Sequence, residues 1–179
     1  MLNRYTVKIM KYIKFIFVMC LLLVVFGLWR GISGQSNILP NQYAVLDSAQ
    51  AYKLVKQCSR YAPKIEGSWN PSIQQIHELE NHIQEISELK ADSCCLIGFK
   101  VNDVNSFYRQ YVGIIANGRK LIYINAFPKT EFDEWPSNIK KPNWKKEPYL
   151  VCDGGEYYWG VSYDPKRKEF FDLAFNGVA

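Results

Sequence analysis

A two-residue turn signal, Asn117-Gly118, restricts most strongly what this chain can fold into. It stands between residues 107–116 and 120–127, two stretches rich in β-branched and aromatic side chains. Asn-Gly is the strongest short-range hairpin signal, because both residues adopt the positive φ angles that a tight turn needs. The sequence therefore predicts an antiparallel hairpin in the second half of the chain.

The predicted hairpin determines which residues lie opposite one another. With a two-residue turn, Ala116 pairs with Arg119, and counting back places Gln110 opposite Asn125. Because successive side chains of a strand point to opposite faces, the register also defines one face of the hairpin. The members of that face are Tyr108, Gln110, Val112, Ile114, Leu121, Tyr123, Asn125 and Phe127.

Helical spacing dominates the first half of the chain. Asn70 is predicted to cap a long helix that has Pro71 at its first position, where a missing N–H costs nothing. The apolar residues of this helix recur at steps of three and four. They are Ile73, Ile76, Leu79, Ile83, Ile86 and Leu89. A shorter helix is predicted from about Ser48 to Arg60, with Asp47 as its cap.

Short apolar runs bounded by turn residues predict further strands. These runs cover residues 96–99, 149–152, 157–163 and 170–175, and a turn at 164–168 joins the last two. Helices followed by antiparallel strands are typical of an α+β domain. We expect residues 47–179 to form one such domain, with two main helices packed on an antiparallel meander sheet of four to six strands.

An unbroken apolar stretch of fifteen residues, Phe15 to Trp29, precedes this domain. As a helix it spans about 22 Å, which is less than the roughly 30 Å of a bilayer's hydrocarbon core. That length is typical of a signal peptide, here cut after Ser33, although flanking apolar residues can lengthen it into an uncleaved anchor. Residues 1–33 are predicted to be a signal peptide or an N-terminal signal anchor, and residues 34–46 a linker.

The net positive charge of the chain belongs to this N-terminal segment. The chain has 22 Lys+Arg and 17 Asp+Glu, and five of the basic residues but no acidic residue precede residue 35. Basic residues ahead of an apolar segment stay inside the cell while the following chain is exported. We therefore expect a domain in the periplasm or on the outer side of the cytoplasmic membrane. Because the exported part has no net charge, its charge gives no support for nucleic-acid binding.

Export changes how the cysteines are interpreted, because disulfides persist outside the cytoplasm. Four of the five cysteines lie in the exported part, and four cysteines allow three pairings. We predict a disulfide between Cys58 and Cys152. Adjacent Cys94 and Cys95 would point to opposite faces of a strand and would rarely bond each other. The alternative is that all four are small buried thiols.

Short motifs throughout the exported part resemble an uncharacterised family of small bacterial exported proteins. These motifs are Gln57-Cys-Ser-Arg60, Trp69-x-Pro71, Arg109-Gln-Tyr-x-Gly-Ile114, Ile122-Tyr-Ile-Asn-Ala-Phe127, Cys152-Asp-Gly-Gly155, Trp159-Gly-Val-x-Tyr-Asp164 and Phe175-Asn-Gly177. The resemblance extends from about residue 47 to the end of the chain. It implies a shared fold and export, and it implies no reaction and no catalytic residue.

The sequence contains no complete catalytic or metal-binding motif. It has no phosphate loop, no Gly-x-Ser-x-Gly and no His-Glu-x-x-His. The only two histidines, His77 and His82, are five apart on a predicted helix and point in different directions, so we predict no metal and no cofactor. The remaining enzymatic hypothesis is a nucleophilic Cys58 with His77 as base and Asp153 as orienting group, or a carboxylate acting as general acid or base.

Polar residues inside the apolar strands suggest a ligand site. The predicted ligand-binding residues are Arg109, Gln110, Asn125, Asp153 and Asn176. In one interpretation the amides form the polar floor of a cleft and Arg109 binds an anionic group. In the other they are structural, with Gln110 and Asn125 paired across the strands and Arg109 paired with Asp153 or Glu80.

An abundance of aromatic residues without a catalytic set favours a binding role over an enzymatic one. We predict a non-enzymatic envelope protein that binds an envelope protein or a small ligand, through an aromatic-rich sheet and the long loop 128–148. Membrane contact would run through the N-terminal segment if that segment is uncleaved. The alternative is an envelope hydrolase using Cys58 or a carboxylate, and a third possibility is a purely structural role.

Overall fold

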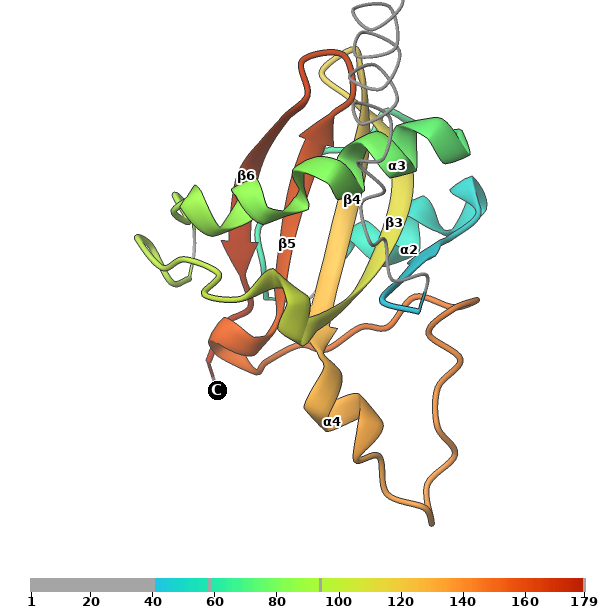
Figure 1. Ribbon diagram of the computed structural model, residues 1–179, viewed down its shortest axis with the longest axis vertical. Helices are drawn as coiled ribbons and strands as arrows, with labels where there is room; N and C mark the ends of the chain where they lie inside the picture. The colour runs from blue at the N-terminus through green and yellow to red at the C-terminus, as the bar shows by residue number, and fades with distance from the viewer. Residues whose placement is uncertain (1–40, 58, 94, 179) are drawn as a thin grey trace, which may run out of the picture. The chain divides into compact units, whose positions relative to one another are not determined.

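The computed structural model describes residues 41–57, 59–93 and 95–178. These residues form a six-stranded, mostly antiparallel sheet with helices packed against it (Figure 1). The predicted α+β class is confirmed. The predicted signal segment, residues 1–33, lies outside the described residues, and within them no helix is both long and apolar enough to span a bilayer.

Strand β3 is central to the connections of the sheet, because three other strands pair with it. The sheet order is β1-β3-β4-β5-β6, and β2 also pairs with β3. β1 is parallel to the first half of β3, and β2 is antiparallel to its second half. The strands are β1 (Tyr43–Val45), β2 (Gly67–Trp69), β3 (Phe107–Ala116), β4 (Arg119–Pro128), β5 (Trp159–Asp164) and β6 (Glu169–Phe175).

The predicted hairpin register is confirmed. Ala116 pairs with Arg119, and Gln110 lies opposite Asn125. The turn residues Asn117 and Gly118 have φ angles of 50° and 68°, as a two-residue hairpin turn requires. β4 and β5 continue the antiparallel order, and the turn predicted at residues 164–168 joins β5 to β6.

The long predicted helix is present, but it begins later than expected. Helix α3 runs from Ile73 to His82 and continues as a 3₁₀ helix to Glu88. Its cap is Ser72 rather than Asn70, because Ser72 and Gln75 form a reciprocal capping box. The backbone N–H of Ser72 donates to the side chain of Gln75 at 2.9 Å, and the backbone N–H of Gln75 donates back at 3.3 Å.

The first helix is shorter than predicted, and this places Arg60 outside it. A 3₁₀ turn is followed by α2, which runs only from Ala51 to Val55. Lys56 leaves the helical conformation with ψ 66°, and the side-chain amide of Gln57 donates to the carbonyl of Leu54 at 2.8 Å. The polypeptide beyond α2 is therefore free to turn Arg60 towards the sheet.

Two predicted strands are absent, and two short strands were missed. Residues 96–99 form a turn in which Gly98 has φ 85° and its N–H donates to Ala91 O at 2.8 Å. Residues 149–152 are extended, but their carbonyls accept side-chain amides instead of joining the sheet. β1 lies inside the segment predicted as a linker, because a strand of three residues leaves no alternating pattern in the sequence.

Both faces of the sheet are covered. α3 lies across one face (Figure 1), where Leu79 belongs to a buried cluster with Ile124 and Val161. α2 covers the opposite face, where Leu54 belongs to a cluster with Val112. The sheet is therefore a middle layer between two apolar clusters, and each of its faces is available only where these helices leave it uncovered.

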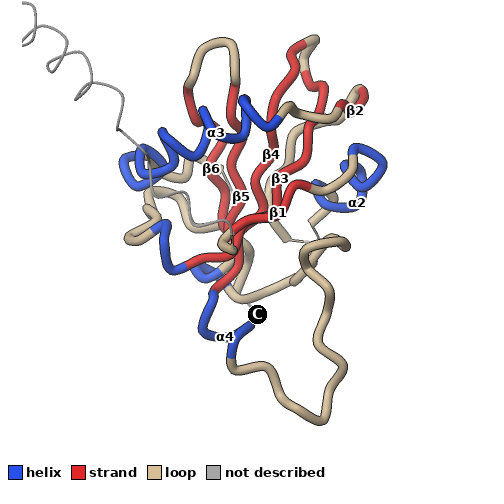
Figure 2. The backbone as a smooth tube through the Cα atoms, turned by 45° about the vertical axis from the view of Figure 1, so that its right-hand side comes forward, coloured by secondary structure: helices blue, strands red, loops and turns tan. Residues whose placement is uncertain are grey.

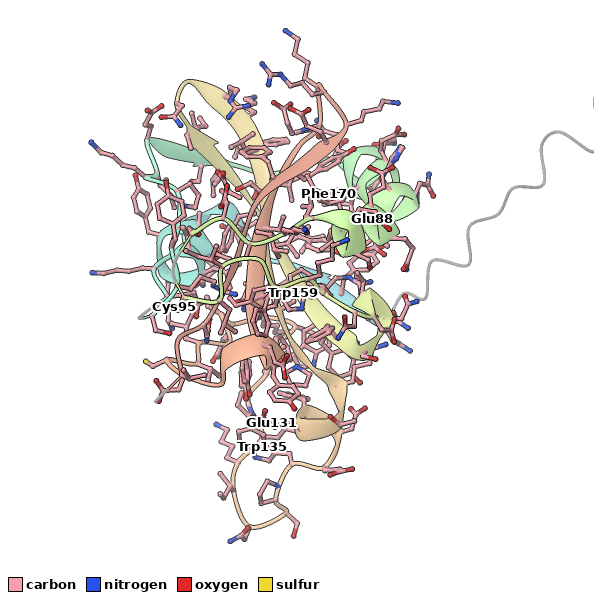
Figure 3. All side chains as sticks on the ribbon, turned by 90° about the vertical axis from the view of Figure 1, so that its left-hand side faces the viewer. Glu88, Cys95, Glu131, Trp135, Trp159 and Phe170 are labelled. Atoms are coloured by element: carbon pink, nitrogen blue, oxygen red, sulfur yellow. The ribbon has the colours of Figure 1, made fainter. Side chains whose placement is uncertain are left out.

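The long loop after β4 carries its own aromatic cluster. α4 (Lys129–Asp133) opens this loop, which extends away from the sheet before it returns to β5 (Figure 2). Phe127, Phe132 and Trp144 are buried together, with the ring centroids of Phe127 and Trp144 5.6 Å apart. Figure 3 shows Glu131 and Trp135 in this outlying part and Trp159 in the middle of the domain.

The abundant aromatic residues form core rather than an exposed binding sheet. Among the seven aromatic residues from 157 to 175, Tyr157 is 59% exposed, Phe171 is partly buried and the other five are buried. The sheet lies between two layers, so both sets of alternating side chains are covered. The expectation that one aromatic set forms an exposed surface is wrong.

Candidate functional site

The predicted ligand residues do not converge on one cleft. Arg109 and Gln110 are neighbours on β3, so their side chains point to opposite faces of the sheet. Arg109 lies on the α3 face, while Gln110 and Asn125 share the opposite face. The cleft that combines all three residues is therefore not present.

Arg109 is part of a fully satisfied ion pair beneath α3. Its Nη2 lies 3.2 Å from a carboxylate oxygen of Glu80, and its Nε donates to the hydroxyl of Tyr111 at 2.8 Å. Its Nη1 donates to the carbonyl of Val104 at 3.1 Å. Burial lowers the pKa of Arg109, but Tyr111 and Glu80 outweigh that effect and raise it overall. This is the structural alternative, in which Arg109 pairs with Glu80.

Gln110 and Asn125 form the predicted cross-strand amide pair. Asn125 Nδ2 donates to Gln110 Oε1 at 3.1 Å, and both side chains are buried. The same two amides also bind the backbone of the long loop: Gln110 Nε2 donates to Glu147 O at 2.7 Å, and Asn125 Nδ2 donates to Tyr149 O at 2.9 Å. Their polar groups therefore hold the loop in place.

Of the other two predicted residues, Asn176 directly follows β6 and Asp153 lies in the loop ahead of β5. Asn176 is buried and donates through Nδ2 to Val151 O at 2.7 Å and to Asp153 O at 2.9 Å. The side chain of Asp153 is exposed. Asn176 thus has the same kind of role as the amide pair, because it binds the backbone ahead of β5.

The enzymatic hypothesis has no assembled centre in the part of the chain that the structure describes. Cys58 lies outside the described residues, and His77 is exposed. His82 Nδ1 contacts the carboxylate of Glu85 at 2.6 Å on the surface. Within residues 41–57, 59–93 and 95–178, no three or more His, Cys, Asp or Glu side chains are placed to hold a metal ion.

Cys95 and Cys152 are both disulfide-bonded. These two cysteines are therefore not free thiols, in contrast to the alternative of four buried thiols. The hydroxyl of Ser59, the residue after Cys58, donates to the carbonyl of Cys152. Cys58 itself is outside the described residues, so its pairing with Cys152 stays a prediction.

An unpredicted residue, Arg60, occupies the same sheet face as the amide pair. Its Nη2 donates to Asn125 Oδ1, and its side chain is largely buried, with the residue 6% exposed. Its Nε and Nη1 have no hydrogen-bond partner among the described residues, and no carboxylate there forms an ion pair with it. Burial lowers the pKa of this guanidinium. Arg60 is therefore a buried cation that has no counter-charge in the described part of the chain.

Three strand residues beneath Arg60 complete this polar site. The hydroxyls of Tyr123 and Ser162, which lie opposite each other on β4 and β5, also lack a hydrogen-bond partner among the described residues. Gly160 makes room for the Tyr123 hydroxyl and the Arg60 guanidinium. A Cβ atom there would lie 2.4 Å from Tyr123 Oη and 3.1 Å from Arg60 Cζ. The absence of a side chain at position 160 therefore leaves room for the Tyr123 hydroxyl and for the guanidinium of Arg60.

A pocket of about 550 Å³ adjoins Arg60. It lies between α2 and the polypeptide that follows it, and its lining consists of Tyr52, Val55, Lys56, Gln57, Arg60, Ala62, Pro63 and Ile65. The two charged residues of this lining, Lys56 and Arg60, are both cationic. The pocket thus combines apolar walls with positive charge, which is the arrangement expected for binding an anion.

The outer wall of the pocket is a segment with little backbone support. Residues 60–65 make no backbone–backbone hydrogen bond with any residue that the structure describes. The segment is held at its two ends instead. The Oγ of Ser59 accepts a hydrogen bond from Gly177 N at 3.1 Å, and Glu66 N donates to Ile115 O at 2.7 Å.

The sequence contains a signal for this site that motif reasoning missed. Between Asp47 and Glu66 there is no acidic residue. The basic residues of that interval are Lys53, Lys56, Arg60 and Lys64. The predicted helix from Ser48 to Arg60 would place Arg60 at its solvent-exposed end. Arg60 is buried because α2 ends at Val55, which the sequence did not indicate.

Comparisons of this chain with protein families, with curated proteins and with solved structures found no match. The resemblance to a family of exported proteins therefore stays a prediction.

Proposed function

We propose that this chain is an exported, non-enzymatic binding protein of the cell envelope, and that it binds a small anionic ligand at Arg60. One observation carries the proposal: Arg60 is buried, yet it has no anionic partner among the described residues. A guanidinium stays protonated in proteins, so it cannot avoid this burial by losing its charge. Burying an unpaired charge lowers the free energy of unfolding by several kcal/mol, which is as much as a severely destabilising mutation does. A bound anion would offset that cost.

The contrast with Arg109 supports this proposal. Arg109 is as buried as Arg60, and it is paired with Glu80 and with Tyr111. The fold therefore supplies a counter-charge for the arginine that has a structural role. The same fold leaves Arg60 with an amide oxygen alone, which is the pattern of a site prepared for a charge from outside the chain.

Export is supported by two independent features. The predicted signal segment, residues 1–33, has basic residues ahead of an apolar stretch too short to be a typical spanning helix. Cys95 and Cys152 are disulfide-bonded, and structural disulfides are typical of proteins outside the cytoplasm. The envelope is therefore the compartment in which the proposed ligand would be met.

Binding of simple anions tests the proposal. Titration calorimetry at low ionic strength with acetate and with inorganic phosphate should detect binding of at least one anion to the wild type. Arg60→Met should abolish it, whereas Arg167→Met, at an arginine whose side chain is 61% exposed, should leave it unchanged. If the wild type binds neither a simple anion nor any ligand from an envelope extract, the proposal is wrong.

A further inference from the structure

We infer that the ligand of the Arg60 pocket is a monocarboxylate with an apolar body, such as a medium-chain fatty acid. This inference rests on the proposed function, and it specifies the chemical class of the ligand. Four features of the site support it: its charge, its unused hydrogen-bond donors, the apolar walls of the pocket and the route by which a ligand can enter.

The charge of the site matches a single negative charge. Arg60 is the only buried cation of the lining, while Lys56 is exposed. A carboxylate has a charge of −1 and therefore balances one guanidinium. A phosphate monoester has a charge of about −1.5 to −2 and would remain partly uncompensated beside one buried cation. The site therefore favours a carboxylate over a phosphate.

The unused hydrogen-bond donors also match a carboxylate. Four of the buried polar groups without a hydrogen-bond partner among the described residues belong to this site: Nε and Nη1 of Arg60 and the hydroxyls of Tyr123 and Ser162. Each of them has at least one hydrogen to donate, whereas an ionised carboxylate only accepts. Its two oxygens offer about four acceptor sites. A carboxylate therefore has acceptor sites enough for the two free nitrogens of Arg60 and for the hydroxyl of Tyr123, which lies close to the same Gly160 position as Arg60 Cζ.

The rest of the pocket is too large and too apolar for a bare anion. Its volume of about 550 Å³ lies in the range of pockets that enclose organic ligands, roughly 300–1,000 Å³. The walls beyond the charged groups include Val55, Ala62, Pro63 and Ile65. The amide of Gln57 is already engaged with Leu54 O. The ligand body that these walls fit is therefore an apolar one.

Access to the free nitrogens of Arg60 requires movement of residues 61–65, which follow it in the pocket wall. The free nitrogens of Arg60 are buried, so a ligand in the pocket does not reach them in this conformation. Residues 61–65 make no backbone–backbone hydrogen bond with the described residues, and Tyr61 is 53% exposed. Segments with few contacts open at low free-energy cost. The hydrogen bonds of Arg60 to Asn125 and of Glu66 N to Ile115 O lie on either side of these residues, so they can move without unfolding α2 or β2.

Calorimetry with four probes tests this assignment on the full exported domain. Octanoate supplies both the carboxylate and the apolar body, acetate supplies only the head group, octanol supplies only the body, and octyl phosphate replaces the head group. Each buried methylene strengthens binding by about fourfold. Octanoate should therefore bind at least tenfold more tightly than acetate, octanol or octyl phosphate.

Two pairs of variants locate the probe. Arg60→Met should weaken octanoate binding at least tenfold, and Arg167→Met should not. Ile65→Ser should weaken octanoate binding while leaving acetate binding unchanged. Ile73→Ser, at an isoleucine that is 55% exposed on α3, should change neither.

The possible results separate the assignment from the proposed function. If octanoate and acetate bind equally and both are lost in Arg60→Met, the anion site stands and the apolar body is wrong. Tighter binding of octyl phosphate than of octanoate would overturn the carboxylate and keep the anion site. If no probe binds a folded wild type, or if binding survives Arg60→Met, both the assignment and its placement at this pocket are wrong.

Discussion

Two buried arginines on opposite faces of the sheet differ in the partners that surround their charge. Arg109 has a carboxylate, a hydroxyl and a backbone carbonyl around it, whereas Arg60 has one amide oxygen. Removing one member of a buried ion pair leaves the other charge without compensation. Arg60 has no counter-charge among the described residues, so its removal leaves no uncompensated buried charge there. The two positions therefore predict opposite effects on stability.

Arg109→Met should lower the free energy of unfolding by about 3–5 kcal/mol, because it leaves the Glu80 carboxylate buried without its cation. Urea denaturation of the purified domain measures this loss. The double variant Arg109→Met, Glu80→Gln should recover part of it, since the uncompensated charge is then absent. Additive losses in the double variant would contradict the pairing.

Gly160→Ala should disturb the Arg60 site, because position 160 lies on the strand against which the guanidinium packs. The added Cβ would lie 2.4 Å from Tyr123 Oη and 3.1 Å from Arg60 Cζ, so both groups must shift, at a cost of about 1–3 kcal/mol. Acetate and octanoate binding should fall along with stability. Gly67→Ala is the control, because its Cβ would meet only the flexible end of Ile115 at 3.3 Å. Unchanged ligand binding in Gly160→Ala would argue against the placement of Arg60.

At the scale of elements, the sequence predicted what periodicity and turn chemistry determine. The register of β3 and β4 followed from Asn117-Gly118, because the turn leaves one alignment. The apolar spacing predicted α3, but its start depended on which of several polar residues caps it. β1 was missed because it is short and pairs through β3 in parallel, so the information for it lies elsewhere in the chain. The Arg60 site was missed for the same kind of reason, since it depends on where α2 ends.

The cap of α3 can be tested directly. Ser72→Ala removes one half of the capping box and should cost about 1 kcal/mol of stability, measured by urea denaturation. Gln74→Ala changes an exposed residue of the same first turn and should cost less than half as much. Equal losses in the two variants would show that the capping box does not contribute.

The stability of the protein should fall at alkaline pH, because Tyr108 donates a hydrogen bond to Asp133 in α4. Burial, together with a hydrogen bond to Asp133, raises the pKa of Tyr108 from 10.0 to about 12. The folded state therefore holds a proton that the unfolded state loses first, so stability is retained below about pH 10 and falls as the pH rises towards 12. Tyr108→Phe should make this fall in the free energy of unfolding less steep. Tyr61→Phe, at an exposed tyrosine, is the control, and an equal change in both would contradict the assignment.

At the scale of the whole molecule, an N-terminal segment with all of the net positive charge precedes a domain without net charge. The domain holds together through two apolar layers, an aromatic loop cluster and disulfides at Cys95 and Cys152. Ser59, beside the Arg60 site, binds the backbone of Cys152 and of Gly177, and its carbonyl oxygen lies 3.4 Å from Cys95 Sγ. The disulfide-bonded end of the domain therefore supports one end of the pocket wall.

Reduction of the domain should weaken both the fold and the pocket. Loss of native disulfides from a small exported domain costs about 2–5 kcal/mol. We expect a lower midpoint in urea after reduction, together with weaker octanoate binding under conditions in which the domain stays folded. Peptide mapping of non-reduced protein from the envelope should show no free thiol at Cys95 or Cys152 and should find Cys152 linked to Cys58. Another partner for Cys152 would contradict the predicted pairing.

Our proposal is that buried Arg60 binds a ligand and does not stabilise the fold. The most direct test is the free energy of unfolding of wild type and Arg60→Met, each measured with and without octanoate. We expect Arg60→Met to be at least as stable as the wild type without octanoate, and we expect octanoate to stabilise only the wild type. A loss of about 3 kcal/mol or more in Arg60→Met without ligand, with no stabilisation of the wild type by octanoate, would show that Arg60 serves the fold instead.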